Sequence, residues 1–137
     1  MRLRALSLSL VPVLVVTVAA VRAPAFRTPH RADITAACTP DKKPFVTPPS
    51  ISMKRADIVE WRSVSPKADS WTITPKDPGD WPWKEGSFSG NRDTTAVTPP
   101  PLPSARTDHP YRYEVRIRCD DGTTQTIDPD IIISTGE

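Results

Sequence analysis

Hydrophobic and polar residues alternate without interruption between Tyr111 and Cys119. The apolar positions of this stretch are Tyr111, Tyr113, Val115, Ile117 and Cys119, and charged residues occupy every position between them. Side chains of a β-strand point alternately to its two faces, so the pattern predicts a strand with one buried face and one solvated face. Asp120-Asp121-Gly122 follows and is typical of a hairpin turn, because glycine adopts the positive φ that such turns need.

Shorter stretches of the same alternation predict further strands. We expect a hairpin partner at residues 123–127, a last strand at 131–133, and earlier strands at 34–38, 45–46, 50–54, 58–62 and 70–74. The strands at 50–54 and 58–62 are expected to pair as a hairpin, and Asp128-Pro129-Asp130 is expected to break the ladder beside the main strand. Residues 75–90 and 91–104 are expected to be irregular.

These elements predict an all-β fold. The 17 prolines exclude long helices, and no stretch after Phe26 keeps a helical apolar period for three turns. About seven short strands separated by turn residues are typical of a Greek-key β-sandwich. We expect one domain at residues 45–137, preceded by a loosely ordered segment at 26–44 with an edge strand.

The first 25 residues have the layout of a secretory signal peptide. Arg2 and Arg4 form a basic start, residues 5–21 carry no charge, and Ala23-Pro24-Ala25 supplies small residues for cleavage. The alternative is a membrane anchor through residues 5–21, but this segment spans only about 25 Å as a helix and a hydrocarbon core is about 30 Å thick. We therefore expect a secreted or periplasmic protein, held at a membrane only where the leader stays uncleaved.

Removal of that leader changes the charge balance. The chain has 18 Lys and Arg against 16 Asp and Glu, and the leader holds Arg2, Arg4 and Arg22 but no acidic residue. The remaining chain therefore has 15 basic and 16 acidic residues. Strong binding to nucleic acid needs a concentrated excess of Lys and Arg, so nucleic acid is not an expected partner.

Cys38 and Cys119 are the two cysteines of the chain. In an oxidising compartment, two cysteines in one small domain are most simply a structural disulfide, which we predict here. The alternative is a reactive or metal-binding thiol, for which the sequence offers no partner residues nearby.

Two segments resemble the cupredoxin family. Residues 49–61, Pro-Ser-Ile-Ser-Met-Lys-Arg-Ala-Asp-Ile-Val-Glu-Trp, are similar to a pattern in which a Pro-x-x-Ile-x-Val strand leads through a Gly-Asp turn into Val-x-Trp, with Ala56 in place of the glycine. Tyr111-Arg112-Tyr113 resembles the Tyr-x-Tyr that opens the copper-ligand strand of that family. The resemblance implies a cupredoxin-like sandwich, and an immunoglobulin-like sandwich is the alternative.

The copper ligands of that family are missing. Val115 stands where the family has its cysteine ligand, Ser70 and Trp71 stand near the place of its first histidine, and no His or Met follows Val115. Blue copper needs two imidazoles and a thiolate at one point. The histidines of this chain are His30 and His109. We therefore expect a domain without copper or another cofactor.

The most suggestive candidate for a binding site is the aromatic group of Trp81, Trp83 and Phe88. Exposed, rigid aromatic side chains in a loop would bind sugar rings, proline-rich peptides or a protein partner. The alternative is that they cap one open end of the sandwich, because a small domain uses its large apolar groups to close its core.

Two other sequence features have a structural and a functional interpretation. Residues 99–103, Pro-Pro-Pro-Leu-Pro, form either a stiff connection or a ligand for a proline-binding module. Four aspartates near the C-terminus are either turn residues or oxygen ligands for Ca²⁺. These aspartates are Asp120, Asp121, Asp128 and Asp130.

A basic row is expected on the solvated face of the main strand. It consists of Arg112, Arg116 and Arg118, with Glu114 among them. The simpler interpretation is a solvated face, or one that pairs with acids on a neighbouring strand. The alternative is an anion-binding strip.

Catalytic signatures are missing from the sequence. The segment 86–90 is not a nucleophile elbow, because Phe88 stands at its centre, and Asp108-His109 has no nucleophile partner. The sequence therefore predicts an exported, non-enzymatic binding or interaction domain whose partner is an unknown protein or small ligand. The alternatives are a copper carrier or electron-transfer protein, and a small hydrolase.

Overall fold

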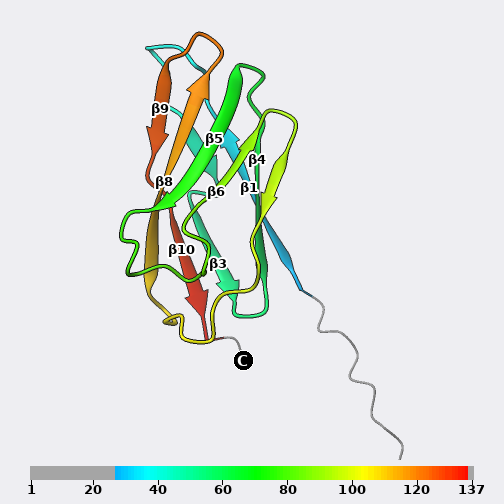
Figure 1. Cartoon of the computed structure of the whole chain (residues 1–137), viewed down its shortest axis with the longest axis vertical. Coiled ribbons are helices and arrows are strands. Elements are labelled where there is room, and N and C mark those ends of the chain that lie inside the picture. The colour runs from blue at the N-terminus through cyan, green and yellow to red at the C-terminus, as the bar shows by residue number, and fades with distance from the viewer. Residues whose placement is uncertain (1–26, 136–137) are drawn as a thin grey trace, which may run out of the picture.

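The computed structural model describes residues 27–135, which form a two-layer β-sandwich (Figure 1). This part of the chain contains ten strands and no helix, so the predicted all-β sandwich is confirmed, with more strands than the seven or so expected. The signal peptide and the alternative anchor, both predicted before residue 26, lie outside the described residues. No membrane-spanning helix is found within residues 27–135.

The first layer is a four-stranded sheet in the order β2-β1-β4-β7. Its strands are β1 (Pro29–Thr35), β2 (Phe45–Thr47), β4 (Ile58–Ser63) and β7 (Thr95–Val97). The two central strands, β1 and β4, run parallel to each other. β2 and β7 flank them in the antiparallel direction and form the two edges of the sheet.

The second layer is a six-stranded sheet built around β8 (Pro110–Cys119), the long alternating strand. The order is β3-β10-β8-β5-β6, and β9 also pairs with β8. The remaining strands are β3 (Ser50–Lys54), β5 (Ala68–Pro75), β6 (Phe88–Asn91), β9 (Thr124–Ile127) and β10 (Asp130–Ser134). β5 lies along one edge of β8, and β9 and β10 follow one another along the other edge (Figure 1).

Asp128-Pro129 separates β9 from β10 without shifting the pairing with β8. Val115 faces Ile127 on one side of this dipeptide, and Tyr111 faces Ile131 on the other, so the register is the same on both sides. The ladder expected to break here keeps its register, and proline removes only the hydrogen bond that its missing N–H would donate.

The core lies between the two sheets and consists of their inward side chains. The largest fully buried side chains are Trp61, Trp71, Tyr111, Tyr113, Ile34, Ile51, Met53, Ile73, Ile117, Ile131, Ile133 and Val59. Each of the five apolar residues predicted along β8 is at most 2 % exposed, as the alternation predicts. Burying one such side chain contributes roughly 1.5–3 kcal/mol, so β8 is a main source of the stability of the fold.

Two expectations about strand positions are wrong. β3 and β4 do not form a hairpin, because β3 pairs with β10 in one sheet and β4 pairs with β1 in the other. The short turn at residues 55–57 therefore carries the chain between the layers, and the carboxylate of Asp57 accepts a hydrogen bond from the Lys54 N–H (2.9 Å). β1 begins at Pro29 rather than at residue 34, and it lies inside its sheet rather than at an edge. Part of the segment expected to be loose is thus a central strand.

β6 and β7 occupy residues that were expected to be irregular. Gly90 of β6 pairs with Trp71 of β5, and a Cβ atom at position 90 would lie 2.4 Å from Cζ2 of that indole. The glycine leaves room for the indole, whose Nε1 donates to the Asn91 carbonyl (3.2 Å). Glycine and asparagine are poor strand formers, so a contact with a distant tryptophan, rather than local propensity, specifies this strand.

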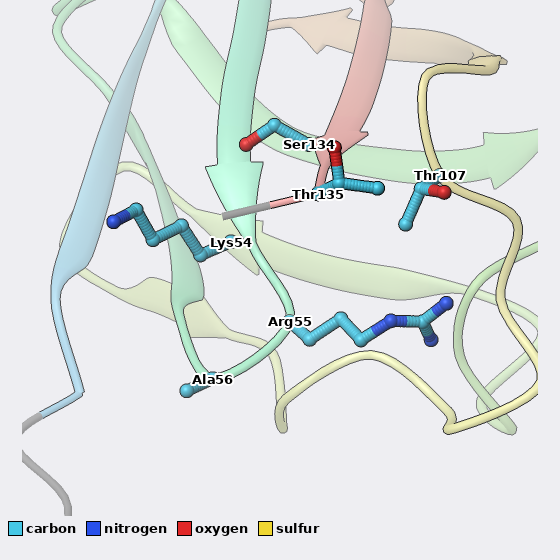
Figure 2. Close-up of a pocket in the computed structure, with 6 residues that line it drawn as sticks. All are labelled: Lys54, Arg55, Ala56, Thr107, Ser134 and Thr135. Carbon is cyan, nitrogen blue, oxygen red and sulfur yellow. The ribbon is translucent and has the colours of Figure 1, made fainter. Parts of the chain in front are cut away.

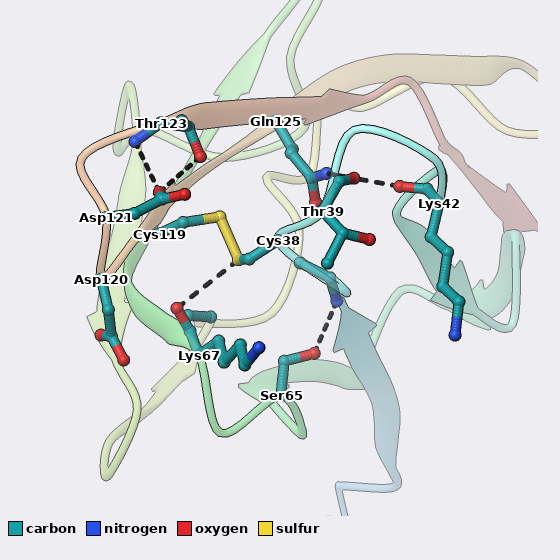
Figure 3. Close-up of a disulfide and its surroundings, with 12 residues drawn as sticks. Cys38, Thr39, Lys42, Ser65, Lys67, Cys119, Asp120, Asp121, Thr123 and Gln125 are labelled. Atoms are coloured by element: carbon teal, nitrogen blue, oxygen red, sulfur yellow. Dashed lines mark hydrogen bonds between the residues drawn. A yellow bond between two sulfur atoms is a disulfide. The ribbon is translucent and has the colours of Figure 1, made fainter.

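Cys38 and Cys119 form the predicted disulfide, with Cα atoms 5.7 Å apart (Figure 3). Cys38 follows β1 and Cys119 ends β8, so the bond joins the two sheets. Beside it, Nε2 of Gln125 on β9 donates to the carbonyls of Thr39 and Lys42 (3.3 Å each). These contacts fasten the loop after Cys38 to the six-stranded sheet.

Candidate functional site

The three aromatic residues predicted as a binding site pack together with Trp61 and Tyr113 of the core. The ring centroid of Trp83 lies 5.0 Å from that of Trp81, 5.7 Å from Phe88 and 6.0 Å from Trp61. Trp83 is 3 % exposed, and Trp81 and Phe88 are half-buried. Edge-to-face ring contacts contribute about 0.5–1.5 kcal/mol each beyond the burial of the rings. The structure therefore places this group as a cap on the core.

The loops around the aromatic group are held by hydrogen bonds within the chain. Nε1 of Trp83 donates to the Pro99 carbonyl (2.7 Å), and Nε1 of Trp81 donates to the Glu85 carbonyl (3.0 Å). The guanidinium of Arg55 donates to three carbonyls between residues 102 and 105. The proline-rich run thus acts as a stiff connection between β7 and β8.

Two buried polar atoms lie beside the aromatic group. Nε1 of Trp61 and the hydroxyl of Tyr113 have no hydrogen-bond partner among residues 27–135. Burial raises the pKa of Tyr113 well above its ordinary value, and the nearby Trp61 indole, which favours the ionised phenol, only weakens this effect. Both groups are therefore neutral at physiological pH and offer no charge to a ligand.

A hollow of about 380 Å³ lies where β3 and β10 end (Figure 2). Its lining residues are Lys54, Arg55, Ala56, Thr107, Ser134 and Thr135. A lining with two cations and no carboxylate would suit an anion, but Figure 2 shows Lys54 and Arg55 pointing in opposite directions. The Arg55 guanidinium is also bound to loop carbonyls at 2.7 Å. The two charges do not converge on one ligand position.

His109 lies in a second hollow, where it belongs to an ion-pair network. Its Nε2 contacts Oδ2 of Asp80 and Nη2 of Arg106, both at 2.7 Å. Hydrogen bonds from Arg106 and then from His109 hold the pKa of Asp80 below its ordinary value. Asp108, its neighbour in the sequence, bonds elsewhere, through its N–H to the Ile133 carbonyl (2.7 Å). Within residues 27–135 no hydroxyl or thiol is hydrogen-bonded to His109, so the network has no nucleophile.

The four aspartates considered as calcium ligands are not brought together. Asp120 pairs with Arg92, and Asp128 pairs with Lys76 (2.7 Å). Asp121 accepts hydrogen bonds within its own turn. In the part of the chain that the structure describes, no three His, Cys, Asp or Glu side chains form a group able to hold a metal ion.

The residues present do not fit a blue-copper centre either. Both cysteines are consumed by the disulfide, so no thiolate is available among the described residues. His30 is bonded to Asp57 (2.8 Å), and His109 is bonded to Asp80. Val115, where the resemblance to cupredoxins would place a cysteine ligand, is fully buried opposite Ile73.

The outer face of the six-stranded sheet carries two arginines of β8 in a regular polar array. Strand register places each arginine in a row that crosses four strands. One row is Asn91, Ser70, Arg118 and Thr124, and the next is Ser89, Thr72, Arg116 and Thr126. Each arginine therefore lies between a hydroxyl residue of β5 and a hydroxyl residue of β9. We call these eight residues the arginine–hydroxyl patch.

The charges of the patch are not balanced within it. Arg116 donates to Glu114, the next outward residue of β8 (3.2 Å). Arg118 forms no ion pair or side-chain hydrogen bond with any residue between 27 and 135, and its cross-strand neighbours Ser70 and Thr124 are uncharged. The patch offers two guanidinium groups, five hydroxyls and one amide to the solvent, without an acidic or aromatic member.

Arg112, the third member of the predicted basic row, lies outside the patch. It faces Asp130 of β10 and lines the hollow that contains His109. The alternation of β8 and β5 predicts which side chains point outward. The hairpin turn predicts β9 beside β8, but the sequence does not show that β5 lies on the other side, so the complete rows of hydroxyls around Arg116 and Arg118 could not be predicted.

Comparison with known proteins gives no matching family model and no curated protein of significant sequence similarity.

Proposed function

We propose that this chain is an exported, non-enzymatic binding domain that holds its ligand on the outer face of the six-stranded sheet. The observation that carries the proposal is the arginine–hydroxyl patch, above all Arg118, which lies exposed between Ser70 and Thr124 with no carboxylate partner in the described part of the chain. A guanidinium presents five N–H donors in a fixed plane and has no acceptor, so it suits a carboxylate, sulfate or phosphate group of a ligand.

The proposed site replaces the aromatic loop that the sequence favoured. Trp83 is buried and bonded to Pro99, and Trp81 is half-buried and bonded within its own loop. Exposing these rings to a partner would remove them from the core that they cap. The patch, in contrast, is available without any change in the fold.

Export is supported by the disulfide and by the leader-like N-terminal sequence. Disulfides persist in oxidising compartments such as the periplasm and the extracellular space. The two segments that resemble cupredoxins support a cupredoxin-like sandwich without its metal, and the two-layer arrangement is compatible with that proposal. The outward Ser, Thr and Arg residues of β5, β8 and β9 then serve binding rather than electron transfer.

The test uses the mature chain on an array of neutral glycans, acidic glycans and acidic peptides. The patch variant is Arg116→Ala/Arg118→Ala, and the matched control is Arg31→Ala/Arg62→Ala, which removes the same charge from the opposite face. We expect binding to at least one acidic class, lost in the patch variant and kept in the control. Binding that the patch variant retains, or a chain that binds nothing on the array, would contradict the proposal.

A further inference from the structure

We infer that the ligand of the arginine–hydroxyl patch is an acidic polysaccharide, a chain of uronate sugars that lies along β8 and contacts β5 and β9 on either side. The inference rests on the proposed function and names its ligand class. It starts from three properties of the patch: the spacing of its arginines, the chemistry of its side chains and the exposure of its arginines.

The spacing of the arginines suits a chain that carries repeated carboxylates. Arg116 and Arg118 are two positions apart on the same face of β8, which corresponds to roughly 7 Å along a strand. Arg118 is free to bind the first carboxylate in a bidentate manner. Arg116 is held by Glu114 over an exposed contact of 3.2 Å, and such surface contacts are weak enough for a ligand carboxylate to displace.

The hydroxyls beside each arginine suit sugar hydroxyls. Neighbouring strands are roughly 4.8 Å apart, so a Ser or Thr hydroxyl stands on both sides of each guanidinium at about the width of one sugar ring. Ser and Thr hydroxyls donate and accept, as sugar hydroxyls do, and bridging water extends their reach. An acidic peptide would supply the carboxylates but would leave most of these hydroxyls without a partner.

The absence of aromatic residues from the patch further narrows the range of ligand classes that fit it. Single-stranded nucleic acid is held largely by stacking of bases on aromatic side chains, and the patch has none. The same absence leaves no ring surface for a neutral sugar, so charge must supply the affinity. Acidic glycan is the class that uses both the guanidinium groups and the hydroxyls.

The two arginines of the patch are exposed on a strand face and line none of the described hollows, which favours a polymer over a small molecule. Small ligands are usually held in concave sites that bury most of their surface. On an open face the affinity of one site is low, and several contacts along one polymer chain add to it. Successive rows of polar side chains on one sheet face form a surface on which an extended chain can lie.

The experiment titrates the disulfide-intact mature chain with four fluorescent probes and measures anisotropy. The probes are oligogalacturonate, the same oligomer with its carboxyls methyl-esterified, oligoglutamate and oligothymidylate. We expect oligogalacturonate to bind most tightly and the methyl ester, which keeps the hydroxyls and loses the charge, to bind at least about tenfold more weakly.

Two variants separate the contributions of charge and hydroxyls. Arg116→Ala/Arg118→Ala should weaken oligogalacturonate binding at least about tenfold, and Arg31→Ala/Arg62→Ala should leave it unchanged. Thr72→Val/Thr126→Val, which keeps the shape of the exposed side chains, should weaken binding of oligogalacturonate but not of oligoglutamate. Thermal melting of each variant checks that it is folded.

The outcomes distinguish the two proposals. If oligoglutamate or oligothymidylate binds through the same arginines as tightly as oligogalacturonate, the glycan inference is wrong and the proposed binding face stands. If the methyl ester binds equally well, or the valine variant loses nothing, the glycan inference is also wrong. If the arginine variant changes the binding of no probe, both proposals are wrong.

Discussion

The two outer faces of this sandwich both consist of strands with alternating side chains, but they differ in whether their arginines are paired with carboxylates. On the four-stranded sheet, register places Arg62 beside Asp33 and Arg31 beside Glu60, and both pairs are in contact, at 2.5 Å and 3.6 Å. On the six-stranded sheet, register places each patch arginine between two hydroxyl residues. Arginines of the four-stranded sheet are paired with carboxylates, whereas Arg118 of the six-stranded sheet has no carboxylate partner among residues 27–135.

The electrostatics of the paired face show what the patch lacks. The hydrogen bond from Arg62 holds the pKa of Asp33 below its ordinary value, and Asp33 in turn raises the pKa of Arg62. Arg118 has no carboxylate in either cross-strand position. Alternation places all of these arginines on an outer face. The residue on the neighbouring strand then determines whether the guanidinium forms an ion pair within the protein.

The largest expected effect concerns the covalent link between the two sheets. Replacing both members of the disulfide, Cys38→Ser/Cys119→Ser, should lower the free energy of unfolding by about 4 kcal/mol, because the bond closes a loop with a sequence separation of 81 residues. Urea unfolding measures the change. A loss below about 1 kcal/mol would show that packing alone holds the two sheets together.

The next effect concerns β6, the strand that carries the outer end of both patch rows. Gly90→Ala should cost about 1–3 kcal/mol, because the new Cβ would lie 2.4 Å from the Trp71 ring. Gly86→Ala is the matched control, since a Cβ there meets nothing within 4 Å. Thermal unfolding of both variants gives the comparison, and equal melting temperatures would contradict the assigned packing of β6.

A smaller effect is expected at the turn by which the chain passes from one sheet to the other. Burial alone would raise the pKa of Asp57, but hydrogen bonds from the Lys54 N–H and from His30 outweigh it and lower the pKa below 3.8. A lowered pKa in the folded state adds stability above that ordinary value, which is lost as the pH falls through the folded pKa. Asp57→Asn should therefore flatten the decline in stability that occurs as the pH falls below the ordinary carboxyl pKa of 3.8.

Denaturant unfolding at several pH values measures this dependence. Asp69→Asn on β5 is the control, because that exposed carboxylate makes no comparable contact with the described residues. If Asp57→Asn and the native chain lose stability in parallel on acidification, the hydrogen bonds at this turn do not stabilise the charged carboxylate.

The smallest effect compares one arginine from each face. Arg62→Ala should lower the melting temperature slightly, because Asp33 loses its partner. Arg118→Ala should leave the melting temperature unchanged, because no residue in the described chain depends on it. The opposite order would mean that the patch arginine has a structural role.

The sequence predicts the parts of this fold that depend on local pattern. The alternation of β8 indicates its buried side, and the Asp120-Asp121-Gly122 turn indicates β9; Gly122 has the expected positive φ of 83°. β6 was not predicted, because it is specified by the contact between Gly90 and a tryptophan on another strand. Local patterns do not encode such distant contacts.

The binding patch also combines features that depend on local pattern with features that depend on distant contacts. The outward position of Arg116 and Arg118 follows from alternation, whereas their hydroxyl neighbours follow from register with β5 and β9. The sequence left both an exposed and a capping position open for Trp83, and the contacts with Trp61 and Phe88 that bury it form only in the folded chain. Which strands lie beside one another is fixed by the tertiary structure.

The most direct test of the central claim is amide chemical-shift mapping by NMR with oligogalacturonate. A ligand on the patch is expected to cause shifts on β5, β8 and β9 that follow its concentration and are centred on Arg118, with no change on β1 and β4. Shifts confined to the four-stranded sheet or to the Trp81–Trp83 loop, or no shifts at all, would contradict that claim.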